Sequence, residues 1–364
     1  MVYTNADRNP HPDYAQLAAD IKDWARALGF QRIGIADTDL FLDERRLQDW
    51  LGAGCHGEMA YMAAHGTKRS RPAELVPGTL RVISASMGYF PASAASPRQV
   101  LADPALGYVS RYALGRDYHK VLRARLLQLA HFIAQASGSL GYRVFTDSAP
   151  VLERALAEKA GLGWMGKHTN LISREAGSWC FLGEIYTSLP LPLDAPESRH
   201  CGRCTRCIDA CPTGAIVAPY RVDARRCVAY LTIELHGSMP LELRPLLGNR
   251  IFGCDDCQLI CPWNRFARST EEPDFLPRHG LDAPRLVQLM EWSETDFSAR
   301  TEGSAIRRVG YERFLRNVAV ALGNVARRDG AVSLALNRRM THPSALVREH
   351  VQWALLRLSQ IPAE

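Results

Sequence analysis

The stretch CGRCTRCIDACP, residues 201–212, contains four cysteines in the spacing C-x2-C-x2-C-x3-C, followed by proline. This spacing is typical of bacterial ferredoxins, in which it binds a [4Fe–4S] cluster and lends its fourth cysteine to a second cluster. A later stretch, GCDDCQLICPW at 253–263, repeats C-x2-C-x3-C-P, and Cys227 precedes it in the chain. The sequence therefore predicts a ferredoxin-like module that holds two [4Fe–4S] clusters.

The pattern of cross-ligation divides eight cysteines into two sets of four. The first set is Cys201, Cys204, Cys207 and Cys261, and the second is Cys211, Cys227, Cys254 and Cys257. The alternative is a pair of zinc sites, but zinc sites usually have paired C-x2-C knuckles, which a run of three cysteines before proline matches poorly. The two cysteines outside this region, Cys55 and Cys180, are expected to be buried apolar residues.

The composition is that of an ordinary globular protein. Ten cysteines in 364 residues are too few for a disulfide scaffold, and the cytosol keeps such thiols reduced. The polar N-terminal stretch lacks the order of a signal peptide, and no apolar run approaches the 18 residues of a membrane span. We therefore expect a cytosolic protein without a membrane segment.

The order of helix and strand patterns predicts three parts. Helical spacing at 14–30, 119–135 and 151–163 alternates with strand patterns at 31–37, 80–90, 142–148 and 178–189, which favours an α/β or α+β domain. Pro150 is expected to open the helix at 151–163 and Gly161 to end it. The expected class is α+β, with an α/β domain at 1–190, a ferredoxin-like domain at 191–268, and a linker with helical repeats at 269–364.

The C-terminal part combines a repeat with a strong positive charge. Two similar blocks, 311–330 and 342–360, lie about 31 residues apart, which fits HEAT-like repeats or an ordinary helical bundle. Residues 306–364 contain ten arginines, no lysine and four acids, so they carry the whole net charge of +6. Because arginine suits phosphate oxygens, we expect nucleic-acid contacts here, although solvated helix faces also carry charge. The candidates are Arg307, Arg308, Arg313, Arg316, Arg338, Arg339 and Arg348.

Several motifs together resemble those of the epoxyqueuosine reductase family, a relative of the reductive dehalogenases. They are FTDSAPVLERALAEKAGLGWMGKHTNLIS (145–173), GSWCFLGEI (177–185), RCVAYLTIE (226–234), the two cysteine stretches, SRYALGRDYHKVL (110–122) and FLRNVAVALGN (314–324). These motifs occur in order and extend over nearly the whole chain.

The resemblance implies an oxidoreductase of queuosine biosynthesis. Its last step is the reduction of epoxyqueuosine to queuosine at the wobble position of tRNA with a GUN anticodon. The implied cofactors are cobalamin and two [4Fe–4S] clusters, and the electrons come from an external reductant such as ferredoxin or flavodoxin. We expect a monomer. The common cobalamin signature D-x-H-x-x-G is absent, because Leu122 stands where glycine should be, and this departure fits the pattern of the family.

The resemblance also implies roles for individual residues. It makes Asp147 the proton donor, since a carboxylic acid can protonate the alkoxide of an opened epoxide, provided that burial keeps it protonated near neutral pH. The alternative is that Asp147 caps the helix that follows. The implied corrin contacts are Arg69, Tyr112, Asp147, Lys167, Asn170 and Asp255. We assign no cobalt ligand to His119 or His168.

Three other functions remain open. A reductase of a small molecule, like the dehalogenases, would not need the basic tail. An iron–sulfur electron carrier would not need the TDSAP motif at 146–150 or the large first domain. A nucleic-acid-binding module with structural clusters would bind no cobalamin.

Overall fold

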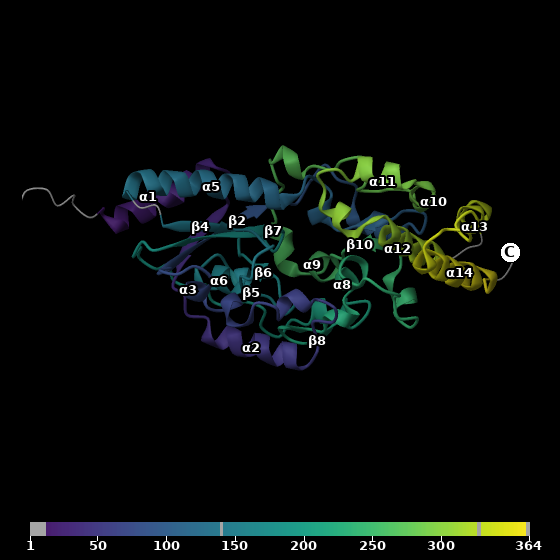
Figure 1. Cartoon of the computed structure of the whole chain (residues 1–364), viewed down its shortest axis with the longest axis horizontal. Coiled ribbons are helices and arrows are strands. Elements are labelled where there is room, and N and C mark those ends of the chain that lie inside the picture. The colour runs from purple at the N-terminus through teal and green to yellow at the C-terminus, as the bar shows by residue number, and fades with distance from the viewer. Residues whose placement is uncertain (1–11, 139–140, 326–328, 362–364) are drawn as a thin grey trace, which may run out of the picture.

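The first part of the chain is built round a four-stranded sheet in the order β1-β2-β7-β4, in which all neighbouring strands are antiparallel. The computed structural model describes residues 12–138, 141–325 and 329–361 (Figure 1). The strands are β1 (Arg32–Ala36), β2 (Arg81–Gly88), β7 (Cys180–Thr187) and β4 (Tyr142–Phe145). All four strand predictions are confirmed. Since α/β folds have mainly parallel strands, the antiparallel pairing makes this part α+β.

Helices cover both faces of this sheet. α1 (Tyr14–Ala27) and α5 (Tyr118–Ser137) pack together on one face, and α6 (Glu153–Lys159) packs on the other (Figure 1). α6 begins at Glu153 and not at Pro150, because residues 147–150 form a separate loop before it. Gly161, with a φ of 75°, follows its last turn as predicted.

Smaller elements surround the sheet. The helices α2 (Phe41–Gly52) and α3 (Pro72–Leu75) lie on the same side as α6 (Figure 1). The remaining elements before the cysteine region are α4 (Pro97–Ala102), β3 (Tyr108–Val109), β5 (Trp164–Met165) and β6 (Leu171–Ile172).

The cysteine region contains two short helices, each of which includes the last cysteine of a C-x2-C motif, Cys207 or Cys257. α7 (Arg206–Asp209) and α9 (Asp256–Leu259) contact each other, so the two motifs face one another. The other elements are β8 (Ile216–Ala218), β9 (Arg221–Val222), α8 (Val228–Ile233) and β10 (Arg250–Phe252). β10 pairs in parallel with β3 and thereby ties this region to the first part of the chain.

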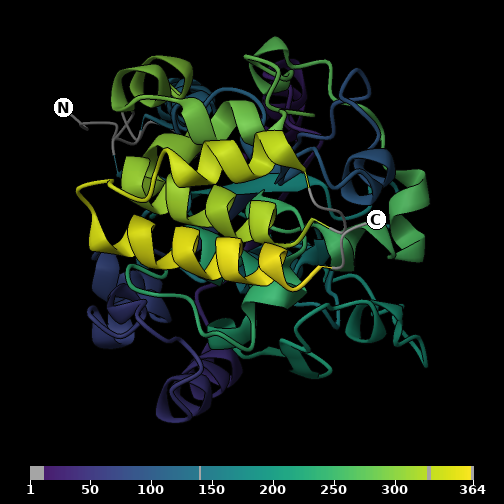
Figure 2. The same ribbon diagram turned by 90° about the vertical axis from the view of Figure 1, so that its right-hand side faces the viewer.

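The C-terminal part is helical, as predicted. Its helices are α10 (Leu286–Glu291), α11 (Glu294–Arg300), α12 (Tyr311–Gly323), α13 (Gly330–Asn337) and α14 (Ala345–Ser359). α12 packs along α14, and both appear side by side in Figure 2. The block at 311–330 ends its helix at Gly323, and residues 326–328 lie outside the described residues. No helix in the described ranges has the length and apolar character needed to cross a membrane.

The hydrophobic cores cross the boundaries expected from the sequence. One core joins the C-terminal helices to Val109, Leu114 and Ile251. Phe275, in the stretch expected to be a linker, is 3% exposed and belongs to the core of the first part. The three parts therefore pack against one another through shared apolar surfaces.

Candidate active site and cluster-binding cysteines

Four cysteines from two separate stretches lie together, as expected for the first cluster. Burial, and then the neighbouring thiols of Cys261, Cys201 and Cys204, raise the pKa of Cys207 to about 11. Burial also raises the pKa of Cys261, which Cys201 and Cys204 again influence. These mutual effects require the four thiols to be close in space, although 54 residues separate Cys207 from Cys261.

A second group of cysteines adjoins the first. Burial raises the pKa of Cys257 well above its ordinary value, and Cys227 and Cys211 act on it in the same direction. Burial likewise raises the pKa of Cys227, which also lies within electrostatic reach of Cys211. Cys207, from the first group, influences Cys257 as well. The two groups are therefore neighbours, which is the arrangement that electron transfer between two clusters needs.

Cys254 completes the second group by its position in the chain. Its thiol donates a hydrogen bond to Asp256 Oδ2 at 2.7 Å, and Arg250 donates to the same carboxylate. The described residues contain no group of three or more His, Cys, Asp or Glu side chains that could hold one metal ion. A four-iron cluster does not require such a group, because each thiolate binds a different iron atom.

Two residues expected to touch the corrin, Lys167 and Asn170, make hydrogen bonds within the protein. Lys167 donates hydrogen bonds to the carbonyl oxygens of Gly202 and Cys204, at 2.8 and 3.0 Å. The backbone carbonyl of Asn170 accepts a bond of 2.9 Å from Gly166. Lys167 thus fixes the loop of the first cysteine group. The charge of Lys167 does not by itself predict this structural role.

Asp255 is likewise engaged by the protein. Its carboxylate is 1% exposed and accepts hydrogen bonds from Tyr108 Oη, Ser110 Oγ and the Arg111 backbone N–H, at 2.7, 2.6 and 2.8 Å. These bonds tie the segment after β3 to the second cysteine stretch. The carboxylate of Asp255 is therefore engaged within the protein, and the corrin contact expected for this residue stays a prediction.

Asp147 lies in the loop between β4 and α6. Its φ of 52° is in the left-handed region, which is strained for a residue other than glycine and is common at functional sites. The Asp147 side chain is 54% exposed, and its backbone N–H donates to Glu153 Oε1. The N-cap residue of α6 is Leu152, so the capping alternative is wrong.

Two residues at the start of α5 contact the carboxylate of Asp147. Tyr118 Oη donates a hydrogen bond to Asp147 Oδ2, and His119 Nε2 lies 3.2 Å from the same oxygen. On its other side, His119 Nδ1 lies 2.7 Å from Asp117 Oδ1. The guanidinium of Arg308 also donates to Asp117, at 3.0 Å. The imidazole is therefore held between two carboxylates.

Asp117, His119 and Asp147 form a hydrogen-bonded row, and their contacts shift the pKa values of His119 and Asp147. Burial lowers the pKa of His119, but its hydrogen bonds to Asp117 and Asp147 outweigh burial and raise it. The surrounding protein raises the pKa of Asp147, but bonds from His119 and Tyr118 and the charge of Arg154 bring it below the ordinary value. In this conformation the contacts favour the ionised form of Asp147 and the charged form of His119, whose charge Arg308 opposes. The protonated Asp147 expected for catalysis stays a prediction.

His119 was not predicted from the sequence to be part of the site. The sequence pattern Asp117-x-His119 could have indicated it, because Asp117 caps α5 and accepts a hydrogen bond of 3.2 Å from the His119 backbone N–H. A cap with histidine two residues later places a carboxylate beside an imidazole. Only the approach of the 146–150 loop supplies the second carboxylate, and that contact spans 28 residues.

Arg69 and Tyr112 lie near Asp147, as expected. Arg69 is 7% exposed, its Nη2 donates to the carbonyl of Tyr61 at 2.9 Å, and its Nε has no hydrogen-bond partner. Burial lowers the pKa of Arg69, whereas Asp147 raises it. The ring of Tyr112 meets that of Tyr118 edge-on, with centroids 6.1 Å apart. His168 Nε2 is another buried polar atom without a partner.

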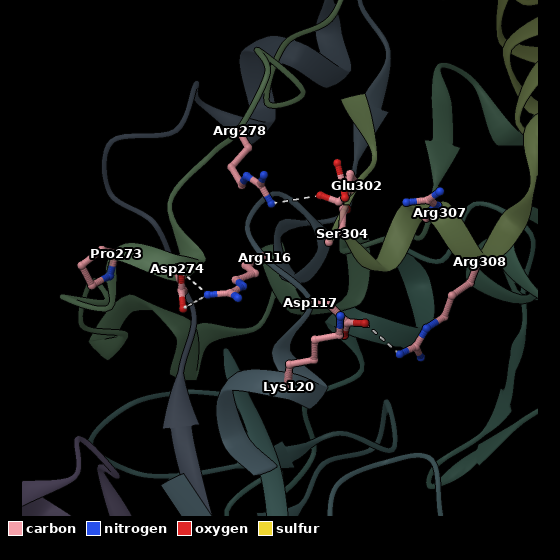
Figure 3. A pocket seen from close by; sticks show the side chains of 11 residues that line it. Arg116, Asp117, Lys120, Pro273, Asp274, Arg278, Glu302, Ser304, Arg307 and Arg308 are labelled. Carbon is pink, nitrogen blue, oxygen red and sulfur yellow. Dashed lines mark hydrogen bonds and ion pairs between the residues drawn. The ribbon is translucent and has the colours of Figure 1, made fainter. Parts of the chain in front are cut away.

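A basic groove begins beside this row (Figure 3). Its volume is about 850 Å³, and it is lined by Arg116, Asp117, Lys120, Pro273, Asp274, Arg278, Glu302, Gly303, Ser304, Arg307 and Arg308. Five of these residues are cations, and they come from three separate segments of the chain. Asp117 and Arg308 belong both to the groove and to the row that ends at Asp147. The groove therefore leads to the proposed site of chemistry.

Several tail arginines bind the protein itself. Arg313 donates to the carbonyl oxygens of Val309 and Ile233, at 2.6 and 3.1 Å. Arg339 donates to those of Met290 and Trp292, both at 2.8 Å.

Two further tail arginines are similarly engaged. Arg338 pairs with Glu291 at 2.7 Å, and Arg348 donates to the carbonyls of His342 and Pro343, at 2.6 and 2.7 Å. Carbonyls near helix ends lack intrahelical partners, and arginine is long enough to reach them. Much of the positive charge counted in the sequence is therefore structural.

Arg316 cannot contact a phosphate in this fold. It is 0% exposed and donates to the carbonyls of Leu231, Leu235 and Gly237, at 2.8, 2.7 and 2.7 Å. Burial lowers its pKa to about 10. This burial corrects the expectation for Arg316, which joins α12 to the cysteine region.

We expect Arg316→Ala to lower the free energy of unfolding by roughly 3 kcal/mol or more, because it leaves buried carbonyls unpaired. Arg338→Ala is the matched control, since an exposed ion pair contributes about 0–1 kcal/mol. Urea unfolding of the cluster-loaded proteins under anaerobic conditions measures the difference. Equal stability of both variants would contradict the structural role of Arg316.

Comparison with known proteins shows to which proteins the chain is similar. Residues 69–148 match the family model described as "Epoxyqueuosine reductase QueG, DUF1730", and residues 200–264 match the "4Fe-4S double cluster binding domain". The chain is 62% identical to an epoxyqueuosine reductase of Pseudomonas aeruginosa, over 97% of each chain. It is 59% identical to that of Escherichia coli K12, over 94% of this chain and 90% of the relative.

Solved structures of epoxyqueuosine reductases also match this chain. A crystal structure of epoxyqueuosine reductase with an epoxyqueuosine-modified tRNA-Tyr stem loop matches with a TM-score of 0.85 at 29% identity, over 94% of this chain and 90% of that chain. A structure from Bacillus subtilis, in which the loop of a catalytic aspartate is swung out of the active site, matches with the same score. The extent and identity of these matches show that the chain belongs to the epoxyqueuosine reductase family.

Proposed function

We propose that this protein reduces epoxyqueuosine to queuosine in tRNA, the last step of queuosine biosynthesis. The observation that carries the proposal is its 62% identity, over 97% of the chain, to a relative of that name. A related enzyme has been solved with an epoxyqueuosine-modified tRNA stem loop. The reaction takes up two electrons and two protons, breaks both C–O bonds of the epoxide, and releases alkene and water.

The electrons pass through two [4Fe–4S] clusters, which correspond to the double-cluster domain at 200–264. We assign Cys201, Cys204, Cys207 and Cys261 to one cluster and Cys211, Cys227, Cys254 and Cys257 to the other. The mutual influence of Cys207 and Cys261, across the two stretches, supports this cross-ligation. Cys227 also lies within electrostatic reach of Arg154, which acts on Asp147. The second cluster is thus the one nearer to the site of chemistry.

Cobalamin is the proposed second cofactor, and the residues near Asp147 fit it. The unpaired buried nitrogens of Arg69 and His168 are suited to a ligand that carries many amide groups. Arg69 and Tyr112 would hold the corrin, with Asn170 and Lys167 on the loop that follows α6. When bound, cobalamin supplies the reduced cobalt centre at which the epoxide is opened. The protein's own residues then provide the protons.

The row Asp117–His119–Asp147 delivers the first proton. His119 carries the proton at Nε2, 3.2 Å from Asp147 Oδ2, and Asp147 passes it to the oxygen of the opening epoxide. Asp117 and Arg308 orient the imidazole for this transfer. Tyr118 fixes the carboxylate by its hydrogen bond.

The basic groove binds the tRNA backbone beside the reacting nucleotide. Its cations Arg116, Lys120, Arg278, Arg307 and Arg308 surround one hollow, and such a group attracts phosphates. The HEAT-like helices α10 to α14 flank it as a platform. Phosphate contacts position the tRNA, and the wobble base must leave the stack to reach Asp147.

The proposal also includes the three-part division at 1–190, 191–268 and 269–364. It further includes a monomer, a cytosolic location and an external reductant.

We expect Arg307→Glu to weaken tRNA binding about tenfold at 0.1 M salt and to reduce the salt slope by about 1. Arg307 lines the groove, and its guanidinium donates a hydrogen bond to Ser298 Oγ, at 3.0 Å. Arg45→Glu, on α2 at the opposite side of the sheet, is the control and should bind normally (Figure 1). Salt-dependent fluorescence titrations with an anticodon stem loop measure both. Equal binding by the two variants would remove the groove from the tRNA interface.

The function itself is tested with anaerobically reconstituted protein, epoxyqueuosine-bearing tRNA and a reductant, with and without cobalamin. Mass spectrometry of the digested nucleosides should show loss of one oxygen only when cobalamin is present. No change of mass, with both clusters confirmed by spectroscopy, would instead favour a small-molecule reductase or an electron carrier.

A further inference from the structure

The inference below rests on the proposed function, because it concerns the second proton of that reaction. Each turnover consumes two protons, and the row Asp117–His119–Asp147 stores one of them. Asp147 must therefore be reprotonated within the turnover before the epoxide oxygen can leave as water. Two glutamates next to this row, Glu153 and Glu184, have no role in the mechanism so far.

Glu184 lies at the centre of the sheet. It belongs to β7 and stands opposite Ser84 of β2 and Phe145 of β4. Its side chain is 0% exposed, and neither carboxylate oxygen has a hydrogen-bond partner among the residues that the structure describes. Ser84 Oγ, on the neighbouring strand, is also buried without a partner. A carboxylate charge is very unfavourable in such surroundings unless it is paired, so Glu184 is expected to carry a proton.

Glu153 connects Glu184 with the loop of Asp147. It is the first residue of α6, which packs across β7, and its Oε1 accepts the backbone N–H of Asp147. Burial, and then Asp147, raise the pKa of Glu153 to about 8. Burial, and then Glu153, raise the pKa of Glu184 well above its ordinary value.

Among the described residues, the cationic groups that act on Glu153 (Arg154 and His119) do not outweigh the burial that raises its pKa. The charged or titratable groups that act on Glu153 or Glu184, or respond to them, are Asp147, Arg154, His119, Arg69, Tyr118 and Tyr186. Two adjacent carboxyl groups do not both ionise easily, because each charge disfavours the other. At neutral pH the pair therefore retains at least one proton, at the end of the loop that carries the ionised Asp147.

We propose that Glu153 and Glu184 form a proton-sharing carboxyl pair that reprotonates Asp147 and so supplies the second proton of the reaction. Asp147 first gives the proton received from His119 to the epoxide oxygen as one C–O bond breaks. The pair then transfers its proton to the Asp147 carboxylate. Asp147 passes it on as the second C–O bond breaks and water leaves. The clusters, recharged by a one-electron carrier, supply both electrons, and solvent reprotonates His119 and the pair.

Infrared spectroscopy of the reconstituted enzyme without tRNA tests the proton store directly. The wild-type protein should show the carbonyl band of a buried protonated carboxylic acid at pH 7, and Glu184→Gln should lose it. The control is Glu44→Gln. Glu44 is also buried, but it is ionised because hydrogen bonds from Arg71 and Ser70 lower its pKa to about 2, so this variant should keep the band. A wild-type spectrum without the band would overturn the proposal.

Single-turnover kinetics test the delivery. Glu184→Gln preserves size and polarity, so cobalamin absorption, cluster spectra and tRNA affinity should match the wild type, while the rate falls roughly 10²-fold. Glu184→Asp should restore part of the rate. If Glu184→Gln loses the band but turns over at the wild-type rate, the pair holds a proton that the reaction does not use, and the proposal fails. If the wild-type enzyme itself removes no oxygen from the tRNA, the proposed function fails, and the infrared result still reports on the pair.

Discussion

Asp147→Asn is expected to lower the turnover rate by about 10² to 10⁴, the range typical of a lost general acid. Asparagine has nearly the same size and can keep the contact to Tyr118, but it cannot pass a proton from His119 to the epoxide oxygen. The expected loss therefore lies in kcat, whereas the affinity for tRNA and the spectra of both cofactors stay as in the wild type. Single-turnover assays with epoxyqueuosine-bearing tRNA, analysed by mass spectrometry, measure it.

The neighbouring substitution Ser148→Ala is the control, since it changes the same exposed loop without touching the carboxylate. The pH dependence gives a second check. His119 has a raised pKa through Asp117 and Asp147, so its proton is present below that pKa and is lost as the pH rises through it. We expect the wild-type rate to fall in the same direction. A fully active Asp147→Asn variant would exclude Asp147 as the proton donor.

Cys261→Ala is the second change with a large expected effect. Although Cys261 lies in the later cysteine stretch, its substitution should damage the cluster whose other ligands are Cys201, Cys204 and Cys207. The physical reason is its closeness to these thiols: Cys201 and Cys204 raise the pKa of Cys261, and Cys261 raises that of Cys207. A cluster that loses one of four thiolates is expected to be incomplete or absent, and electrons then no longer pass from an external reductant. Turnover should fall to background.

Electron paramagnetic resonance and iron analysis of the reduced protein identify which cluster is lost. Cys55→Ala is the matched control, because Cys55 is 5% exposed and lies outside both cysteine groups. It should retain two clusters and full activity. Loss of the other cluster in Cys261→Ala, with the first intact, would reverse the assignment of ligands.

Local patterns in the sequence were sufficient for the elements and for the grouping of the cysteines. Each of the four sheet strands and the long helices α1, α5 and α14 has the periodicity of its structure, and the structure contains them. The cysteine spacing predicted two neighbouring groups because three thiols in one turn face a single cluster. The elements and each cysteine stretch depend on residues close together in the chain, for which spacing translates directly into geometry, whereas the meeting of the two stretches is a tertiary contact.

The protonation of Asp147 was not predictable in this way. Burial alone favours the neutral acid, but His119 and Tyr118 bring it below its ordinary pKa. Those residues belong to α5, and the loop meets them through a tertiary contact. Local sequence thus identifies a candidate acid, while distant neighbours decide where its proton resides.

The roles of the tail arginines were likewise not predictable from the sequence alone. Their number predicted a phosphate surface, but Arg316 is buried against three backbone carbonyls, and the cations of the groove come partly from residues 116–120 and 278. The sequence by itself determined which elements form, which cysteines group together and to which family the chain belongs. Only the tertiary structure decided which charges face solvent, which carboxyl groups hold protons and which segments share the site, because burial and pairing depend on contacts between residues far apart in the chain.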